Sequence, residues 1–172
     1  MEIVKYPDPL LRQLSDPVEH IDEKFLKYVN GQFFQFMKDR DGLGLAAPQA
    51  GILKRFFVFD STYLTSGMKR IVINPEIIER TGEEIFYEEG CLSLPEIYAK
   101  VKRHEKIRVK YINGEGEETE EKLDGINARV FQHEYDHLKG VLFIDRLSPV
   151  EKVKIKSELK MLKKEYKKNG KG

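Results

Sequence analysis

Cysteine is nearly absent from this sequence, because the 172 residues include only one, Cys91. A single thiol cannot form a disulfide within the chain, and a cytosolic thiol is expected to stay reduced. A lone cysteine in an intracellular enzyme is a candidate nucleophile or metal ligand. Cysteine is more often a small buried apolar residue, so the thiol by itself indicates no function.

Long hydrophobic runs are absent as well. No segment reaches the roughly 18 apolar residues that a membrane-spanning helix requires. The first residues, MEIVKYPDPLLRQ, do not combine a basic region with an apolar stretch, as a secretory signal would. We therefore expect a cytoplasmic protein that does not associate with a membrane.

No excess of one charge sign marks the chain as a whole. The formal net charge is +1, which gives no reason to expect nucleic-acid binding, whether general or sequence-specific. The charge is uneven, however, because residues 148–172 contain nine Lys and three Glu, a net charge of +6 that leaves −5 for the remainder. This basic segment could dock on an acidic partner, but a solvated helix face explains it equally well.

The composition is that of a folded domain. Hydrophobic residues make up 40% of the chain and charged residues 34%, with ten Phe and eight Tyr, which is too aromatic for a disordered protein. No internal repeat or low-complexity linker divides the sequence. The length favours one domain with a sizeable core, so we expect residues 1–172 to form a single domain.

Apolar residues at helical spacing predict two helices before the C-terminal segment. The first extends from about Asp22, which can cap its first turn, to Arg40. Gly31 weakens this helix by about 1 kcal/mol relative to alanine. The second covers residues 126–138, and Gly140 lies where a glycine commonly ends a helix.

The C-terminal segment predicts a third helix. Ser148 suits the N-cap, Pro149 the first helical position, and Glu151 would complete a capping box. The lysines fall on the face opposite an apolar stripe. That stripe consists of Val150, Val153, Ile155, Leu159, Leu162 and Tyr166.

Several short segments predict antiparallel strands. The candidates are Arg55–Asp60, Ile71–Asn74, Ile77–Glu79 and Glu84–Tyr87, with a turn at Thr81-Gly82. A better-marked hairpin follows. Its strands are Lys106–Ile112 and Glu117–Leu123, joined at Asn113-Gly114, which is a strong turn signal.

The strongest chemical signal is the sequence H-E-x-x-H inside the predicted second helix, from His133 to His137. Residues four apart share one face of a helix, about 5–6 Å apart, so both imidazoles can bind one metal ion. Glu134 can reach a metal-bound water as a general base. The element order then indicates an α+β domain, in which antiparallel strands pack around this central helix, with an N-terminal and a C-terminal helix.

Two histidines leave a tetrahedral metal site incomplete, since a catalytic site needs a third protein ligand and one open position. A thermolysin-like protease would supply an acidic residue after His137, and a metzincin a third histidine. No histidine follows His137, and three of the four acidic candidates, Asp145, Glu151, Glu158 and Glu165, suit a solvent-facing helix surface better. Cys91 remains the strong candidate, beside Gly90, whose backbone is unrestricted.

The segment GLGLAAPQ, residues 42–49, is the third unusual feature. It lacks the G-K-[ST] ending of a phosphate-binding loop. Its small residues would let a substrate backbone approach closely, and Gln49 could direct its amide N–H at a developing oxyanion. A flexible connection is an equally good interpretation of this segment alone.

Taken together, the three segments closely resemble the peptide deformylases, whose motifs have the form GxGLAAxQ, EGCLS and HExxDH. This chain contains GLGLAAPQ, EGCLSLP and QHEYDH in that order. The resemblance implies removal of the formyl group from the formyl-methionine of newly made polypeptides, with release of formate. It also implies that Cys91, His133 and His137 hold one divalent metal, Fe²⁺ in cells, which Ni²⁺, Co²⁺ or Zn²⁺ can replace.

The resemblance further implies a role for each site residue. Glu134 would take a proton from the metal-bound water that attacks the formyl carbon and return it to the leaving amine. Gln49 and the backbone N–H of Leu92 would stabilise the oxyanion, and Gly44 would pair with the substrate backbone. Glu89 and Arg103 would form an ion pair that supports the cysteine segment.

The outer part of the substrate site is less well defined by the sequence. Leu43, Ile126 and Val130 flank the motifs and could form walls of an apolar pocket for the methionine side chain. Tyr98 departs from the family pattern, because some bacterial members have an arginine there that contacts the substrate. Tyr98 could stack or donate a hydrogen bond, or lie half-buried beside the hairpin.

Three other functions remain to be weighed. The chain could be an H-E-x-x-H metallopeptidase, a non-catalytic relative with a structural metal, or an enzyme that uses Cys91 as a nucleophile. By resemblance, the basic C-terminal helix could also dock near the ribosomal exit tunnel. The lysines of that hypothesis are Lys152, Lys156, Lys160, Lys163, Lys164 and Lys167.

Overall fold

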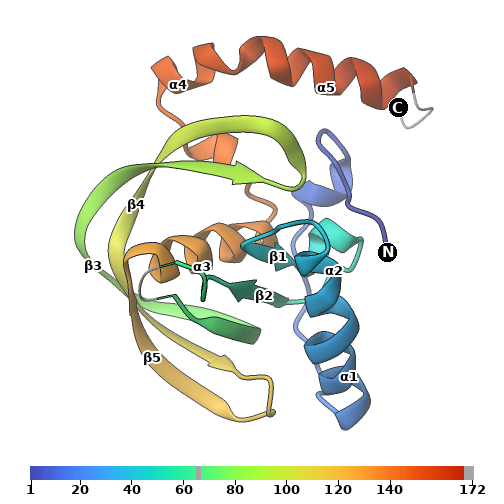
Figure 1. Ribbon diagram of the computed structural model, residues 1–172, viewed down its shortest axis with the longest axis vertical. Coiled ribbons are helices and arrows are strands. Elements are labelled where there is room, and N and C mark those ends of the chain that lie inside the picture. The colour runs from blue at the N-terminus through green and yellow to red at the C-terminus, as the bar shows by residue number, and fades with distance from the viewer. Residues whose placement is uncertain (65–66, 169–172) are drawn as a thin grey trace.

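A five-stranded antiparallel sheet, in the order β1-β2-β3-β4-β5, forms the body of the protein. The structure is a computed structural model that describes residues 1–64 and 67–168. The strands are β1 (Gly44–Ala46), β2 (Phe56–Asp60), β3 (Lys69–Cys91), β4 (Leu94–Ile112) and β5 (Glu118–Asp124). The long strands β3 and β4 curve around helix α3 (Gly125–Leu138), so that this helix lies inside the bend of the sheet (Figure 1).

The curvature arises from irregular pairing between β3 and β4. Register shifts occur at four places along this pair, and one of them, between Thr81 and Glu84, includes Gly82 at φ +72°. A bulge of this kind adds a residue to one strand and bends it without reversing the chain. The prediction of separate short strands joined by a turn at Thr81-Gly82 is therefore wrong, since glycine here serves a bulge.

The second predicted hairpin is confirmed. Strands β4 and β5 pair in regular register around a turn at Asn113, whose side chain accepts hydrogen bonds from the backbone N–H groups of Glu115 and Glu117. Strand β4 begins at Leu94, twelve residues before the predicted start at Lys106. Its alternating residues Ile107, Val109 and Tyr111 are buried against α3.

Helix α3 confirms the central helix. Its apolar residues Ala128, Phe131 and Leu138 pack against the sheet, and most of its polar residues are buried as well. Gly140 follows the helix end at φ +68°, and a Cβ there would lie 2.4 Å from the backbone oxygen of Arg12. Glycine is therefore required both by the backbone angle and by the close approach of the N-terminal segment.

The predicted N-terminal helix is confirmed, but it is not α-helical throughout. Asp22 caps α1 (Glu23–Tyr28) as predicted, but a π-helical turn (Val29–Phe33) separates it from α2 (Phe34–Lys38). Gly31 lies within this turn. The inward residues of this region, Val29, Phe33, Phe36 and Met37, form a core cluster with strand β2.

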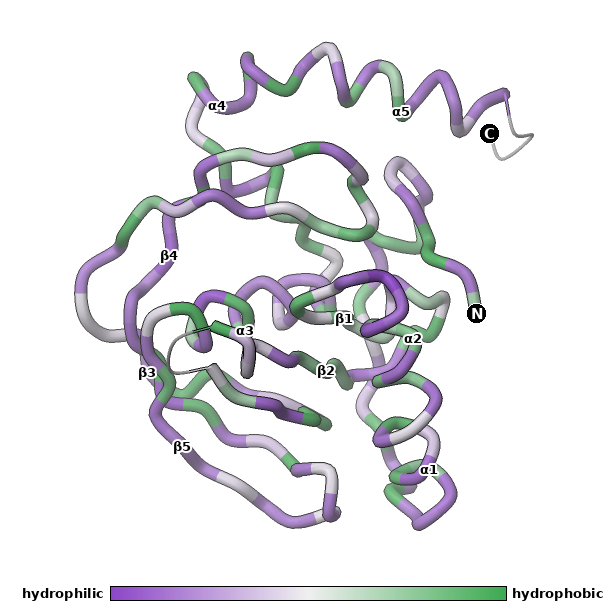
Figure 2. The backbone as a smooth tube through the Cα atoms, viewed as in Figure 1, coloured by the Kyte–Doolittle hydropathy of each residue, from purple (hydrophilic) through white to green (hydrophobic). Residues whose placement is uncertain are grey.

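The C-terminal helix is interrupted at Ile155, which separates α4 (Pro149–Lys154) from α5 (Lys156–Lys168). Ser148 caps α4 as predicted, but Glu151 binds the backbone N–H of Lys100 on β4 and does not complete the capping box. Figure 2 shows hydrophilic and hydrophobic residues alternating along both helices. Ile155 is buried, whereas Val150 and Val153 are 66% and 72% exposed, so the predicted apolar stripe fails in α4.

Short 3₁₀ turns and the N-terminal segment complete the fold. The turns are Pro9–Arg12, Ala47–Ala50 and Phe143–Arg146. The backbone N–H groups of Val4 and Tyr6 donate to the carbonyls of Gln49 and Ser93, each at 2.8 Å. The N-terminal segment thus ties together two loops that flank α3. Within the described residues, no helix combines the length and apolarity needed to cross a membrane.

Candidate metal centre

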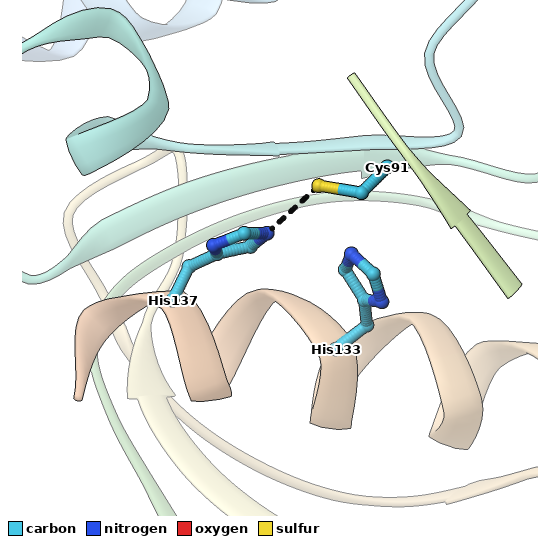
Figure 3. A group of neighbouring side chains, drawn as sticks. All are labelled: Cys91, His133 and His137. Carbon is cyan, nitrogen blue, oxygen red and sulfur yellow. Dashed lines mark hydrogen bonds between the residues drawn. The ribbon is translucent and has the colours of Figure 1, made fainter. Parts of the chain in front are cut away.

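Helix α3 and the end of strand β3 bring three metal-binding side chains together. His133 and His137 lie one turn apart on α3, and Cys91 is the last residue of β3 (Figure 3). Their potential ligand atoms all lie within 4.8 Å of one another, and Cys91 Sγ is 3.3 Å from His137 Nε2. The three residues predicted from sequence as metal ligands therefore form one cluster.

The donor set fits a divalent transition metal. A thiolate at about 2.3 Å and an imidazole nitrogen at about 2.1 Å lie roughly 3.6 Å apart in a tetrahedral site, close to the observed spacing. Among residues 1–64 and 67–168, no further side chain of histidine, cysteine, aspartate or glutamate joins these three as a fourth ligand. Three protein ligands leave one position open, which is typical of a catalytic site.

The carboxylates that a thermolysin-like protease would need are engaged elsewhere. Asp145 pairs with Arg12, and Glu151 binds the Lys100 backbone. Neither belongs to the metal cluster. This finding argues against the hypothesis of a metallopeptidase. The open fourth coordination position argues against a purely structural metal.

Glu134 lies beside the cluster and has one carboxylate oxygen without a hydrogen-bond partner among the described residues. Glu134 is 3% exposed, it lines a cavity whose wall includes Cys91 and His133, and its Oε2 is buried with no hydrogen-bond partner among the described residues. Gly44 of β1 packs directly against it, because a Cβ at position 44 would lie 2.4 Å from Glu134 Oε1. The glycine therefore makes room for the carboxylate.

Gln49 also points at the cluster. Its Oε1 accepts a hydrogen bond from the Ala46 backbone at 2.8 Å, which fixes the side-chain amide. Its Nε2 lies 3.3 Å from both Cys91 Sγ and Ser93 Oγ. The segment from Leu45 to Gln49 is buried, so the interpretation of residues 42–49 as a flexible connection is wrong for this part.

A buried ion network supports the metal ligands from behind. Glu89 accepts hydrogen bonds from Arg103 Nε at 2.6 Å and from His133 Nδ1 at 2.9 Å, which leaves His133 Nε2 as the ligating nitrogen. The ion pair expected between Glu89 and Arg103 is thus present. Arg103 also donates to Asp136, which in turn pairs with Arg146.

Burial and charge set the protonation of these groups. Burial raises the pKa of Glu134 to about 7. Burial opposes ionisation of Glu89, but hydrogen bonds from His133 and Arg103 outweigh it and lower its pKa. Burial also disfavours the charged imidazoles. It lowers the pKa of His137, whereas for His133 contacts with Cys91 and Glu89 prevail and raise the pKa.

The residues proposed to contact substrate line the same cavity, which has a volume of about 450 Å³. Leu43, Gly44, Leu92, Ile126 and Val130 are all in its wall. Tyr98 is at its edge, 62% exposed rather than half-buried. Its ring covers Gly90, where a Cβ would approach the ring to 2.5 Å.

Sequence reasoning missed several residues that shape the centre. Ser93 is fully buried against Gln49, and Asp136 and Arg129 belong to the ion network behind the ligands. Arg129 lies one helical turn before His133, so its position on the ligand face was a usable signal. Its partners on β3 and β4 could not be identified without the strand pairing.

The curved antiparallel sheet, the central H-E-x-x-H helix and a three-ligand centre open to a cavity define a metal-dependent hydrolase. The polypeptide deformylase family model matches residues 1–153. A peptide deformylase of Thermotoga maritima is 47% identical over 154 residues, which cover 90% of this chain and 91% of that protein. The chain belongs to the peptide deformylase family.

Solved structures agree with this assignment. Arabidopsis thaliana peptide deformylase 1B matches with a TM-score of 0.90 at 39% identity, covering 98% of this chain and 93% of the other. Peptide deformylase from Plasmodium falciparum matches with a TM-score of 0.89 at 42% identity, covering 96% and 97%. The fold and the family assignment therefore agree.

Proposed function

We propose that this chain removes the formyl group from the N-terminal formyl-methionine of nascent peptides and releases formate. The observation that carries the proposal is the convergence of Cys91, His133 and His137 beside a cavity that is lined by Cys91, His133 and Glu134, whose Oε2 has no hydrogen-bond partner among the described residues. Family membership supplies the substrate class, since the centre alone would suit hydrolysis of several amides.

The buried carboxylate of Glu134 is suited to proton transfer. When bound, a divalent metal supplies Lewis-acid polarisation and lowers the pKa of water. Glu134 accepts the proton of the attacking water and returns it to the amine that leaves. A pKa near 7, caused mainly by burial, suits a group that both accepts and donates a proton at neutral pH.

Donors and small residues around the centre suit a formyl carbonyl. We propose that Gln49 Nε2 and the Leu92 backbone N–H stabilise the oxyanion, because Gln49 is fixed by Ala46 and Leu92 lines the cavity next to Cys91. Gly44 would pair with the substrate backbone. Leu43, Ile126 and Val130 would enclose the methionine side chain.

Formate release from a formyl-Met-Ala peptide tests the proposal. Wild type and Glu134→Ala should be purified without oxygen, with metal content measured for both. We expect formate from wild type and a loss of at least 10²-fold in the variant at unchanged metal content. Glu121→Gln is a matched control, because Glu121 is partly buried and outside the cavity. No formate from metal-loaded wild type would refute the proposal.

The identity of the metal is a separate proposal. We propose Fe²⁺ in cells, because the Cys-His₂ donor set accepts several divalent metals and the resemblance favours iron. Iron with a thiolate ligand should be sensitive to oxygen. Activity of iron-loaded protein should therefore decay faster in air than under argon, whereas the Ni²⁺ form should decay equally in both. Equal half-lives for the iron form would contradict this.

The basic C-terminal helix supports a proposal on location. We propose that the protein works in the cytoplasm and that α5 docks on the ribosome, since its lysines are exposed. Lys156→Glu, Lys160→Glu and Lys164→Glu together should abolish cosedimentation with ribosomes at low salt. The control reverses three exposed lysines elsewhere, Lys24, Lys106 and Lys122. Equal binding by both variants would refute docking through α5.

A further inference from the structure

Arg129 occupies an unusual place for a charged residue. It is only 6% exposed, and it lies on α3 one turn before the metal ligand His133. A buried guanidinium is costly unless its hydrogen bonds are satisfied by well-placed acceptors. Arg129 has three such acceptors, and they come from both strands that bend around α3.

The first acceptor is the carboxylate that contacts His133. Arg129 Nη1 donates to Glu89 Oε1 at 2.7 Å, and the other oxygen of Glu89 accepts a hydrogen bond from His133 Nδ1 at 2.9 Å. Arg103 donates to both oxygens of Glu89, but it also donates to Asp136. Glu89 is the carboxylate partner of Arg129 among the described residues, and the guanidinium also lies 5.6 Å from the centre of the Tyr87 ring.

The other acceptors are backbone carbonyls. Arg129 Nη1 donates to the carbonyl of Val101 on β4 at 3.0 Å, and Nη2 donates to the carbonyl of Ile85 on β3 at 2.8 Å. Val101 pairs with Tyr87 in the sheet, so both carbonyls lie in the part of the hairpin that leads to Glu89 and Cys91. A planar fork can satisfy these acceptors together, which a lysine ammonium cannot do with the same geometry.

These contacts join the two elements that carry the metal ligands. Helix α3 supplies His133 and His137, and the end of β3 supplies Cys91 together with Glu89. We propose that Arg129 is a positioning residue, which holds Glu89 against His133 Nδ1 and fixes the spacing between α3 and the end of β3. The proposal rests on the metal centre and is independent of which amide the enzyme hydrolyses.

Metal affinity measured on metal-free protein tests this role. Co²⁺ binding would be followed by competition with a chromophoric chelator under argon, for wild type, Arg129→Met and Arg129→Lys. Outer contacts to metal-binding histidines typically change affinity by about 10–100-fold, and we expect a Kd increase of that size for Arg129→Met. Arg129→Lys should increase Kd about threefold or more, because it keeps the charge and loses the fork.

A spectroscopic readout separates positioning from general stability. The visible absorption of Co²⁺ at saturation reports ligand geometry and should change in both Arg129 variants. Arg70→Met is the matched control, since Arg70 makes a bidentate pair with Glu121 and is not in the wall of the metal cavity. Arg70→Met should lower the midpoint of thermal unfolding. Its Kd for Co²⁺ should stay within twofold of wild type, and its Co²⁺ spectrum should be unchanged.

The Kd and the Co²⁺ spectrum test the positioning role of Arg129 independently of catalytic activity. A Kd within twofold of wild type with an unchanged Co²⁺ spectrum, in either Arg129 variant, would overturn it. If Arg129→Met does not fold, Arg129→Lys alone gives the decision by the same two measurements. A failure of formate release in all proteins would refute the proposed function and leave this result standing.

Discussion

Replacing Gly44 with alanine should displace the carboxylate of Glu134 and lower the catalytic rate without removing the metal. A Cβ at position 44 would lie 2.4 Å from Oε1, 2.8 Å from Cδ and 2.9 Å from Cγ of Glu134. Ordinary contacts start near 3.4 Å, so the carboxylate must move by about 0.5–1 Å. Displacement on this scale can reduce the rate by about 10²-fold. We expect kcat/KM to fall by about 10–10²-fold, which corresponds to roughly 1.4–2.8 kcal/mol of activation free energy.

Kinetics on formyl-Met-Ala, with metal analysis and thermal unfolding, would check this expectation. The metal content should be unchanged, because the three atoms nearest to the added Cβ all belong to Glu134 and none belongs to a metal ligand. Overpacking should cost about 1–3 kcal/mol of stability. Gly31→Ala is the matched control, since nothing lies within 4 Å of the added Cβ. If Gly44→Ala kept kcat/KM within twofold of wild type, the steric argument would be wrong.

Three further outcomes follow from the structure. Burial raises the pKa of Glu121, but hydrogen bonds from Arg70 and Tyr111 outweigh burial and lower it. The ionised carboxylate therefore stabilises the folded state fully above the unfolded-state pKa of about 4.3, and this contribution is lost as the pH falls through the folded-state pKa. Glu121→Gln should therefore cost about 0.5–1.5 kcal/mol in urea unfolding at pH 7 and less at pH 3, and an equal loss at both would contradict this. Removing the metal with a chelator should lower the thermal midpoint, and adding Co²⁺ should restore it in proportion to RT ln(1 + [Co²⁺]/Kd). Residues 1–172 are expected to unfold in one transition, and separate transitions by fluorescence and circular dichroism would argue for two domains.

Local patterns in the sequence predicted the parts of this structure that depend on neighbouring residues. The spacing of His133 and His137 fixes them on one helical face, and Asp22 and Ser148 cap helices wherever these pack. Cys91 could be chosen as the third ligand because acidic candidates after His137 were poor and the family motif supported it. These predictions required no knowledge of strand pairing.

Features that depend on distant partners were not predictable in the same way. The turn signal at Thr81-Gly82 is chemically the same in a hairpin and in a bulge, and only pairing with β4 distinguishes them. The strand β1 was missed because three residues give too short an alternation, and its burial depends on contact with β2 and α3. The break at Ile155 was likewise not predictable from local sequence, since Ile155 is buried in a cluster with residues of β4.

The ion network explains why the metal centre tolerates so many buried charges. Charged residues are expected at the surface, yet Glu89, Arg103, Arg129 and Asp136 are all nearly inaccessible. Well-packed apolar residues of similar volume would often be at least as stabilising, so stability alone does not account for the network. The Arg103–Glu89 pair connects β4 to β3, the other three contacts connect α3 to β3 or β4, and one of those three ends on a metal-binding histidine. Directional hydrogen bonds fix the orientation of His133, which apolar packing could not specify, and this requirement accounts for charge inside the fold.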